Sequence, residues 1–281
     1  MATTTSSLII SSNPKFLKHH PKVFTSNQTY PFVNFPKSNQ KNLIITSSHS
    51  SSSSSIILEN EKDPFQIGRF LTNQEHKNVV FLQNYGYNQE LESGSLFIRV
   101  MRFDELDETV SLLSESFAES MLLPKAYVKF LGFLVKQYLI ERRVVMPHAA
   151  TLLGFFKESG EEELKLCGTV EVCFNQRGAN ASPPTPTVPK NQPYISNMTV
   201  KKSFRRRGIG WHLLNSSEEL ISQMSSSKEV YLHCRMIDAI PFNMYTRAGY
   251  VVYKTDSILT LLTLQRRKHL MRKHLQVSNS F

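Results

Sequence analysis

The first 58 residues of this 281-residue sequence contain no aspartate, no glutamate and no arginine. They contain instead five lysines and twenty serines or threonines. An acid-free, serine-rich leader is typical of a transit peptide, and the lack of arginine favours the plastid over the mitochondrion. Residues 1–58 are therefore predicted to be a cleavable plastid transit peptide, with the mature protein in the chloroplast stroma. A merely disordered serine-rich tail is the alternative.

Long apolar runs and paired cysteines are lacking as well. No run approaches the roughly eighteen consecutive apolar residues that a membrane-spanning helix needs, so no span is expected. The three cysteines, Cys167, Cys173 and Cys234, form no C-x-x-C pair and are odd in number, which argues against a disulfide framework. We expect buried thiols in a reducing compartment, and no metal site.

The net charge of +10, from 33 basic and 23 acidic residues, is concentrated at the two ends of the chain. Residues 1–58 carry +5 and residues 265–281 carry another +5, so residues 59–264 are neutral. A basic isoelectric point of this origin does not indicate a nucleic-acid-binding core, and nucleic acid is not an expected partner. Residues 265–281 are predicted to be a basic C-terminal tail, in the form of a solvated terminal helix.

Hydrophobic patterns and prolines divide the rest of the chain. Residues 59–94 are polar and irregular, which predicts a linker, and a folded domain is predicted over 95–264. Five prolines fall within residues 176–193, which predicts a long surface insertion because proline cannot pair inside a sheet.

The expected elements within the domain alternate in a characteristic order. Strands are expected at 95–101, 149–156, 165–174, 194–200, 229–235, 250–254 and 257–264, and helices at 104–117, 124–143, 208–224 and 238–247. Hairpins at the front and strand-helix-strand crossovers at the back predict an α/β (α+β) fold. Its sheet should be mixed and mostly antiparallel, with six to seven strands flanked by about four helices.

A basic, glycine-containing turn, "RRRGIG", joins the strand at 194–200 to the following helix. The first N–H groups of a helix lack partners and carry a partial positive charge. Glycines at the entry let the backbone approach a ligand closely, so the turn is suited to a pyrophosphate. The spacing is neither that of a P-loop nor G-x-G-x-x-G, which disfavours an NTPase or a Rossmann site.

Two motifs at the proper distance resemble the GNAT superfamily of acetyl-CoA-dependent N-acetyltransferases. The turn resembles R/Q-x-x-G-x-G/A, with Arg205, Gly208 and Gly210 in the defined places. The stretch "DAIPFNMYTRAGYVVY" resembles N-x-x-A-x-x-x-Y-x-x-x-G-F/Y, although Asp238 stands where asparagine is usual. The resemblance covers residues 95–264 and implies the GNAT fold. With the leader, it is closest to the plastid acetyltransferases that act on protein lysines and N-termini.

The resemblance implies acetyl-CoA as cosubstrate and a role for each site residue. Backbone groups of the strand before the turn would hold the pantetheine arm and thioester: Met198, Thr199 and Val200. The turn would hold the pyrophosphate: Arg206, Arg207, Gly208, Ile209, Gly210 and Trp211. The second motif would complete the cofactor site: Asp238, Ala239, Ile240 and Tyr245.

Proton transfer would involve a tyrosine and a base. Tyr245 matches the superfamily's general acid, since a phenol keeps its proton at neutral pH and can protonate a thiolate. His233 is the candidate base because imidazole titrates near neutrality, although a hydrogen-bonded strand histidine is an equal alternative. Glu171 is the second candidate for the base.

The predicted function is acetyl transfer from acetyl-CoA to protein amines in the plastid, on lysine side chains, with N-terminal α-amines as a second acceptor class. Two alternatives stay open. One is a small-amine acetyltransferase that acts on polyamines or arylalkylamines, and the other is a catalytically weak acetyl-CoA-binding regulatory module. The oligomeric state is not predicted.

Overall fold

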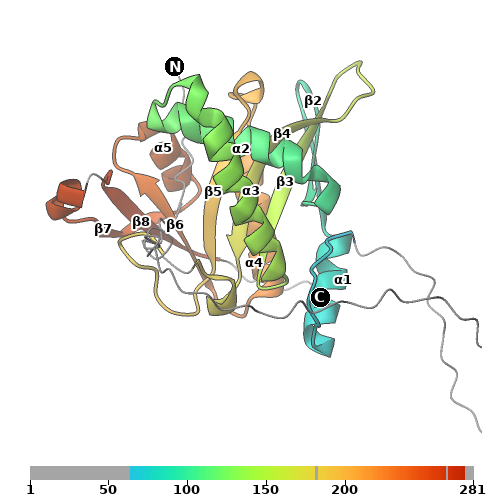
Figure 1. Cartoon of the computed structure of the whole chain (residues 1–281), viewed down its shortest axis with the longest axis horizontal. Helices are drawn as coiled ribbons and strands as arrows, with labels where there is room; N and C mark the ends of the chain where they lie inside the picture. Colours follow the sequence, from blue (N-terminus) through green and yellow to red (C-terminus); the bar gives the residue numbers. More distant parts are fainter. Residues whose placement is uncertain (1–63, 181–182, 264, 276–281) are drawn as a thin grey trace, which may run out of the picture. The chain divides into compact units, whose positions relative to one another are not determined.

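The computed structural model describes residues 64–180, 183–263 and 265–275. These form an eight-stranded sheet in the order β1-β2-β3-β4-β5-β6-β8-β7, which Figure 1 shows with helices on both faces. Every neighbouring pair is antiparallel except β5 and β6, which are parallel. The mixed, mostly antiparallel α/β sheet predicted from the sequence is thus confirmed, with one strand more than expected.

The strands have the following bounds: β1 Gly86–Leu91, β2 Gly94–Val100, β3 Ala149–Glu158, β4 Lys165–Cys173, β5 Tyr194–Val200, β6 Glu229–Arg235, β7 Val251–Thr255 and β8 Lys268–His274. The α-helices are α1 Asn73–Asn84, α2 Leu106–Met121, α3 Val128–Val144, α4 Ile209–Met224 and α5 Ala239–Arg247. Short 3-10 turns include η4 Gln176–Gly178, η5 Lys202–Phe204 and η6 Ile258–Thr263.

The two faces of the sheet have separate cores. Helices α2 and α3 cover one face, where Phe117, Leu139 and Leu153 belong to one buried cluster. Helix α4 covers the other, where Leu213 packs in a cluster with Val170. Strand residues alternate between the two because successive side chains of a strand point to opposite faces. A ligand that reaches a central strand therefore meets different side chains on the α2/α3 face and on the α4 face.

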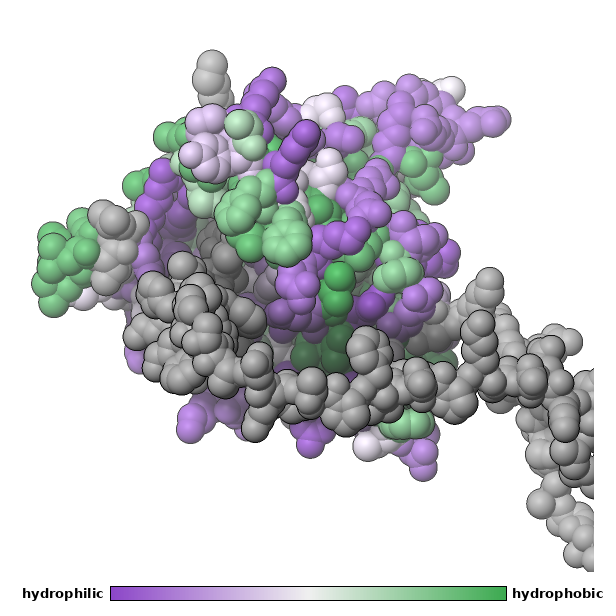
Figure 2. Space-filling model, viewed as in Figure 1, coloured by the Kyte–Doolittle hydropathy of each residue, from purple (hydrophilic) through white to green (hydrophobic). Residues whose placement is uncertain are grey.

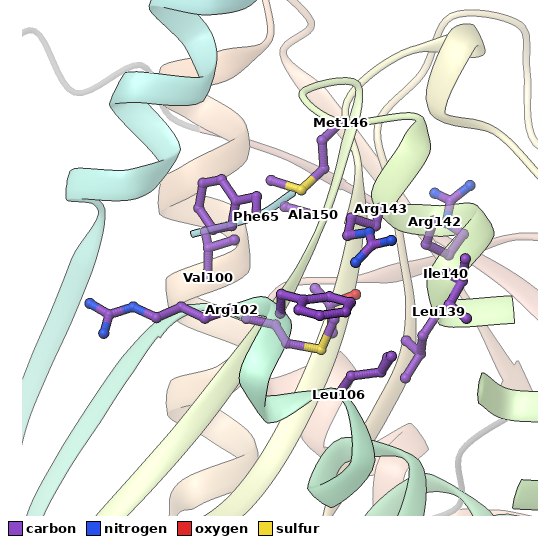
Figure 3. Close-up of a pocket in the computed structure, with 13 residues that line it drawn as sticks. Phe65, Val100, Arg102, Leu106, Leu139, Ile140, Arg142, Arg143, Met146 and Ala150 are labelled. Atoms are coloured by element: carbon purple, nitrogen blue, oxygen red, sulfur yellow. The ribbon is translucent and has the colours of Figure 1, made fainter. Parts of the chain in front are cut away.

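The prediction that residues 59–94 form a linker is wrong for the part that the structure describes. Helix α1 begins with a capping box between Thr72 and Glu75, and its Leu82 is fully buried. Phe65, only 2% exposed, lies beside Val100 and Met146 in Figure 3. The sequence pattern does not predict this folded segment, because its few apolar residues are widely spaced and become buried only against the sheet.

The predictions for the end of the chain are also wrong. The basic segment is not a terminal helix but strand β8, which lies between β6 and β7 and buries Leu270 and Met271. The apolar segment expected as a strand at 257–264 is described as the 3-10 turn η6, where Ile258 and Leu262 are exposed. It forms the apolar projection at the left of Figure 2, next to β7 in Figure 1.

The charges of β8 are compatible with its place inside the sheet because several have acidic partners. Arg272 pairs with Glu229 at 3.2 Å and Lys273 with Glu218 at 2.5 Å. Long basic side chains can cover apolar surface with their stems while their charged ends reach such partners. A count of charges along the sequence cannot distinguish this arrangement from a solvated tail.

Three further expectations concern the leader, membrane spans and the thiols. The predicted transit peptide lies outside the described residues. Within the part that the structure describes, no helix is both long and apolar enough to cross a membrane. Cys167, Cys173 and Cys234 are buried free thiols, as predicted.

Candidate active site

The parallel strands β5 and β6 pair over two residues each and then diverge. The pairing ends at Ile195 and Leu232, after which β5 continues alongside β4 while β6 continues alongside β8. Met198, Thr199 and Val200 lie on the diverging part of β5. The structure thus places the three residues predicted to hold the pantetheine arm at a gap between neighbouring strands.

A kink in β5 accompanies this gap. The register between β4 and β5 shifts between Thr169 and Glu171, and Asn197 adopts a left-handed φ of 48°. Gly168 permits the close approach of the two strands, because a Cβ there would lie 2.8 Å from the carbonyl oxygen of Thr199. Such a bulge reorients the backbone that follows it, and it is common beside active sites.

The basic turn ends in the N-terminus of α4. Arg206 and Gly208 both have left-handed backbones, with φ of 70° and 79°. The first helical hydrogen bond runs from the Trp211 N–H to the Gly208 carbonyl at 2.9 Å. The N–H groups of Gly208, Ile209 and Gly210 precede this bond and lie at the positive end of the helix dipole. The Trp211 amide, which we predicted to face the pyrophosphate, is engaged within the helix.

The three arginine side chains of the turn have different surroundings. Arg205 forms a double ion pair with Glu119 of α2, at 3.0 and 2.6 Å, and also donates to the Val200 carbonyl. Arg207 pairs with Glu158 of β3 at 2.6 Å. Arg206 is exposed. Two of the three arginines therefore fix the turn to its neighbours.

An ion pair neutralises the aspartate that departs from the resembled motif. Asp238 precedes α5 and pairs with Arg235 at 2.7 Å, and both side chains are 8% exposed. Arg235 also donates to the Ser120 carbonyl near the end of α2. The charge of Asp238 thus has a fixed partner, while the adjoining Ala239 and Ile240 are exposed at the start of α5.

Tyr245, the predicted general acid, is buried in α5, and its ring packs edge-on against that of Tyr250 at 6.0 Å between centroids. Burial raises the pKa of Tyr245 far above its usual range, with smaller contributions from Cys234 and Asp238. The phenol therefore keeps its proton throughout the neutral range. The catalytic role itself stays a prediction.

His233, the first candidate for the base, has both ring nitrogens in hydrogen bonds. Nε2 donates to the Pro186 carbonyl at 2.8 Å, so Nδ1 of the neutral ring accepts from the Tyr194 hydroxyl, also at 2.8 Å. Burial lowers the pKa of His233 to about 4. A neutral ring with both nitrogens occupied has no site for a substrate proton, so the geometry favours the alternative of a hydrogen-bonded strand histidine.

Glu171, the second candidate, lies on β4 inside a buried polar cluster. Its carboxylate is 3.0 Å from the Arg142 guanidinium of α3 and accepts from the Tyr138 hydroxyl at 2.6 Å. The side-chain amide of Asn197, at the kink of β5, donates to it at 3.3 Å. The cluster connects helix α3 to the kinked strand, and burial together with Glu171 raises the pKa of Tyr138.

Several of these partners were missed in the sequence. Glu119, Arg142 and Arg235 each supply the counter-charge of a site residue, yet none belongs to a motif. Arg235 gave one usable signal, since it stands three residues before Asp238 at the end of an apolar strand. Pairings across the fold, such as Arg205 with Glu119, leave no local signal.

A gap between parallel strands, a glycine-containing turn at the start of the next helix and a buried tyrosine on the helix after that form the arrangement expected of an acyl-CoA-dependent transferase. The model of the Acetyltransferase (GNAT) family matches residues 124–250. The chain belongs to this family and is an acetyltransferase, which confirms the resemblance read from its two motifs.

A curated relative shares most of the chain. Over 269 residues, the sequence is 57% identical to GCN5-related N-acetyltransferase 5, chloroplastic, of Arabidopsis thaliana. The aligned region covers 89% of this chain and 84% of the relative.

Solved structures with a similar fold are more distant. RimL, a ribosomal L7/L12 alpha-N-protein acetyltransferase in complex with coenzyme A, has a TM-score of 0.48 and 8% identity, over 68% of this chain and all of its own. Arabidopsis thaliana NAA60 with a bisubstrate analogue has a TM-score of 0.46 and 14% identity, over 65% of this chain and 99% of its own.

Proposed function

We propose that this protein transfers acetyl groups from acetyl-CoA to protein amines in the plastid, on lysine side chains and N-terminal α-amines. The proposal rests on the gap between β5 and β6, on the glycine-containing turn that leads from β5 into α4, and on the buried Tyr245 of α5, the helix that follows β6. The name of the Arabidopsis relative supports the plastid location.

The turn and the diverging strand fit acetyl-CoA. Left-handed backbones at Arg206 and Gly208 expose successive N–H groups ahead of α4, which suits a pyrophosphate. The kinked part of β5, with Met198, would pair its backbone with the amides of the pantetheine arm. The cosubstrate supplies a thioester, whose carbonyl carbon the amine attacks.

Tyr245 supplies the proton that the departing thiolate needs. The amine nitrogen forms a bond to the carbonyl carbon, the carbon–sulfur bond breaks, and the phenol protonates the sulfur. A phenol whose pKa is raised by burial is protonated before this step, and it regains its proton easily afterwards. The reaction thereby avoids release of a free thiolate.

Glu171 is our choice for the group that accepts the amine's proton. It lies in register with Ser196, the first residue of β5 beyond its last partner in β6. The hydroxyl of Tyr138 and the amide of Asn197 extend its hydrogen-bond network along the kinked strand. His233, with both nitrogens engaged, is better suited to a supporting role.

A protein acceptor is favoured by exposed apolar side chains on the segments that follow β6 and β7. The turn η6 presents exposed apolar side chains at Ile258, Leu259 and Leu262, and Met236 and Ile237 are exposed just before α5. A small amine needs contacts only inside a pocket, whereas exposed apolar patches are typical of protein interaction sites. These residues offer such contacts to a polypeptide.

The test is to incubate residues 59–281 with acetyl-CoA and a mixed pool of peptides, polyamines and arylalkylamines, and to identify the products by mass. We expect acetylated lysines and N-termini of peptides. Acetylation of small amines alone would replace the proposal with the small-amine enzyme. Tight binding of acetyl-CoA without any product would favour the regulatory module.

Residues 1–58 are proposed to direct the protein to the plastid. A fluorescent protein fused behind this segment should enter plastids and be cleaved near residues 50–65, because the segment is free of acids and arginine. Fluorescence spread evenly through the cytosol would show that the segment is not a transit peptide.

A further inference from the structure

The described residues of the Pro-rich insertion, 176–180 and 183–193, are attached to the domain near their start and in their middle. At its start, Arg142 of α3 donates to the Gly178 carbonyl at 2.6 Å. In its middle, His233 donates to the Pro186 carbonyl at 2.8 Å. The second contact reaches a strand in the interior of the sheet, so the described part of the insertion around Pro186 lies against the domain.

His233 stands where β5 and β6 separate. It follows Leu232, the last residue of β6 that pairs with β5. Leu232 and Cys234 belong to the core on the α4 face, so His233 points to the opposite face. There its ring packs against Tyr194, with 5.5 Å between ring centroids. The Pro186 carbonyl is thereby held at the mouth of the gap, on the α2/α3 face.

The two sides of the gap would serve different reactants. Tyr245 belongs to the core of the α4 face, and the glycine-containing turn leads directly into α4. A thioester held from that side leaves the face with His233 and Glu171 for the incoming amine. Such an approach lets the amine reach the carbonyl carbon from one face while Tyr245 protonates the sulfur from the other.

A pocket of 420 Å³ separates the insertion from the sheet on this face. Val188 and Pro189 line it from the insertion, Tyr194 from β5, and Glu171 and Arg142 from the polar cluster. The insertion therefore encloses a space that reaches the carboxylate we chose as the base.

We propose that the Pro-rich insertion forms one wall of the passage for the acceptor amine, and that His233 is the positioning residue that holds this wall at the mouth of the gap. The inference rests on the proposed function, since the passage is the route of the amine to the thioester. It assigns His233 a role in acceptor recognition instead of proton transfer.

Substitutions at His233 separate the two roles because glutamine and phenylalanine each abolish an imidazole base. His233→Gln keeps a side-chain N–H that can donate to Pro186. His233→Phe keeps an aromatic ring and leaves both the Pro186 carbonyl and the Tyr194 hydroxyl unpaired. Tyr194→Phe removes one hydrogen bond of the pair and serves as the intermediate case.

Steady-state kinetics on a peptide acceptor provides the first readout. We expect His233→Phe to raise the KM for the peptide by about tenfold, the scale of one to two lost buried hydrogen bonds, with the KM for acetyl-CoA unchanged. His233→Gln should restore most of the wild-type value and keep the wild-type pH profile. An equal loss of kcat in both variants, with an altered pH profile, would overturn the proposal in favour of a base.

Limited trypsin digestion provides a readout that needs no substrate. Lys190 is an exposed cleavage site inside the insertion. Release of the wall in His233→Phe should speed cleavage after Lys190, while His233→Gln should be cleaved like the wild type. Equal cleavage in all three proteins contradicts the anchoring role. A wild type that acetylates no peptide would refute the proposed function alone, because the digestion still tests the anchor.

Discussion

The proposed cofactor side of the gap, on the α4 face, and the proposed acceptor side, on the α2/α3 face, are built in different ways. The cofactor side comes from two continuous stretches, 198–211 and 238–245, and relies on backbone groups at the start of a helix. The acceptor side gathers single side chains from α3, β4, β5 and β6 and backbone carbonyls from the Pro-rich insertion. The cofactor side is a local sequence motif, whereas the acceptor side is assembled only by the tertiary structure.

The two sides also differ in how their charges are buried. The Arg205–Glu119 pair on the cofactor side leaves the glutamate side chain 32% exposed. The Arg142–Glu171 pair on the acceptor side leaves the two side chains only 8% and 3% exposed. Buried charges depend on their partners far more than exposed ones do. The acceptor side should therefore be the more sensitive to loss of a counter-charge, and the cofactor side to changes of backbone conformation.

The largest effect is expected for Arg142→Met, which leaves Glu171 buried without its partner. Loss of one member of a buried ion pair costs about 3–5 kcal/mol of unfolding free energy. Urea denaturation should measure this loss. Arg205→Met is the matched control, since its partner Glu119 is partly solvated and the expected cost is about 1 kcal/mol. Equal losses in the two variants would remove the contrast between the two sides.

Tyr245→Phe should come next, through turnover and not stability. The substitution keeps the buried ring and its packing against Tyr250 but removes the hydroxyl proton. We expect kcat to fall by about 10²-fold with the affinity for acetyl-CoA preserved. Rapid-quench kinetics with a confirmed acceptor provides the measurement. A variant with wild-type turnover would mean that water or the amine protonates the thiolate.

Gly208→Val tests the backbone of the cofactor side. Gly208 has a φ of 79°, which a β-branched residue adopts only at a cost of about 1–2 kcal/mol. Relaxation of the turn should weaken acetyl-CoA binding by about tenfold in calorimetry. Gly210→Ala is the control, because an added Cβ there meets its nearest neighbours at 3.6 and 3.7 Å, which is ordinary contact. If both variants bind like the wild type, the turn does not hold the pyrophosphate.

Arg205→Met should have a smaller effect on acetyl-CoA binding. Its guanidinium faces Glu119 and the Val200 carbonyl, so backbone N–H groups are left to supply most of the contacts to the phosphates. We expect the dissociation constant to rise only about threefold, the scale of a partly exposed ion pair. A rise as large as that of Gly208→Val would show that side-chain charge dominates on the cofactor side as well.

The smallest effect should come from Glu75→Gln, outside both sides of the gap. Arg69, the Thr72 amide and His148 hold the pKa of Glu75 well below its ordinary value of 4.5. A lowered pKa stabilises the folded state above pH 4.5, and the stabilisation is lost as the pH falls below that value. The stability difference between wild type and variant should therefore shrink between about pH 5 and pH 3, with acetyl-CoA affinity unchanged. A pH-independent difference would exclude this linkage.

The sequence by itself determined the family and predicted the residues of the proposed cofactor side. Arg205, Gly208, Gly210 and Tyr245 occur at fixed spacings because a helix start and a short helix are local structures, whose geometry follows from neighbours in the chain. The alternation of apolar residues likewise predicted most strands and helices between 95 and 255. Local rules sufficed wherever the chemistry depends on backbone conformation.

Only the tertiary structure decided the place of the basic strand and the partners of the acceptor side. Strand β8 is stable because it buries Leu270 and Met271 between β6 and β7, a gain that no local pattern of charges predicts. His233 looks like a base in the sequence, but the fold brings the Pro186 carbonyl and the Tyr194 hydroxyl to its two nitrogens. Side chains distant in the sequence acquire their protonation state and their role from such contacts, which exist only after the sheet has formed.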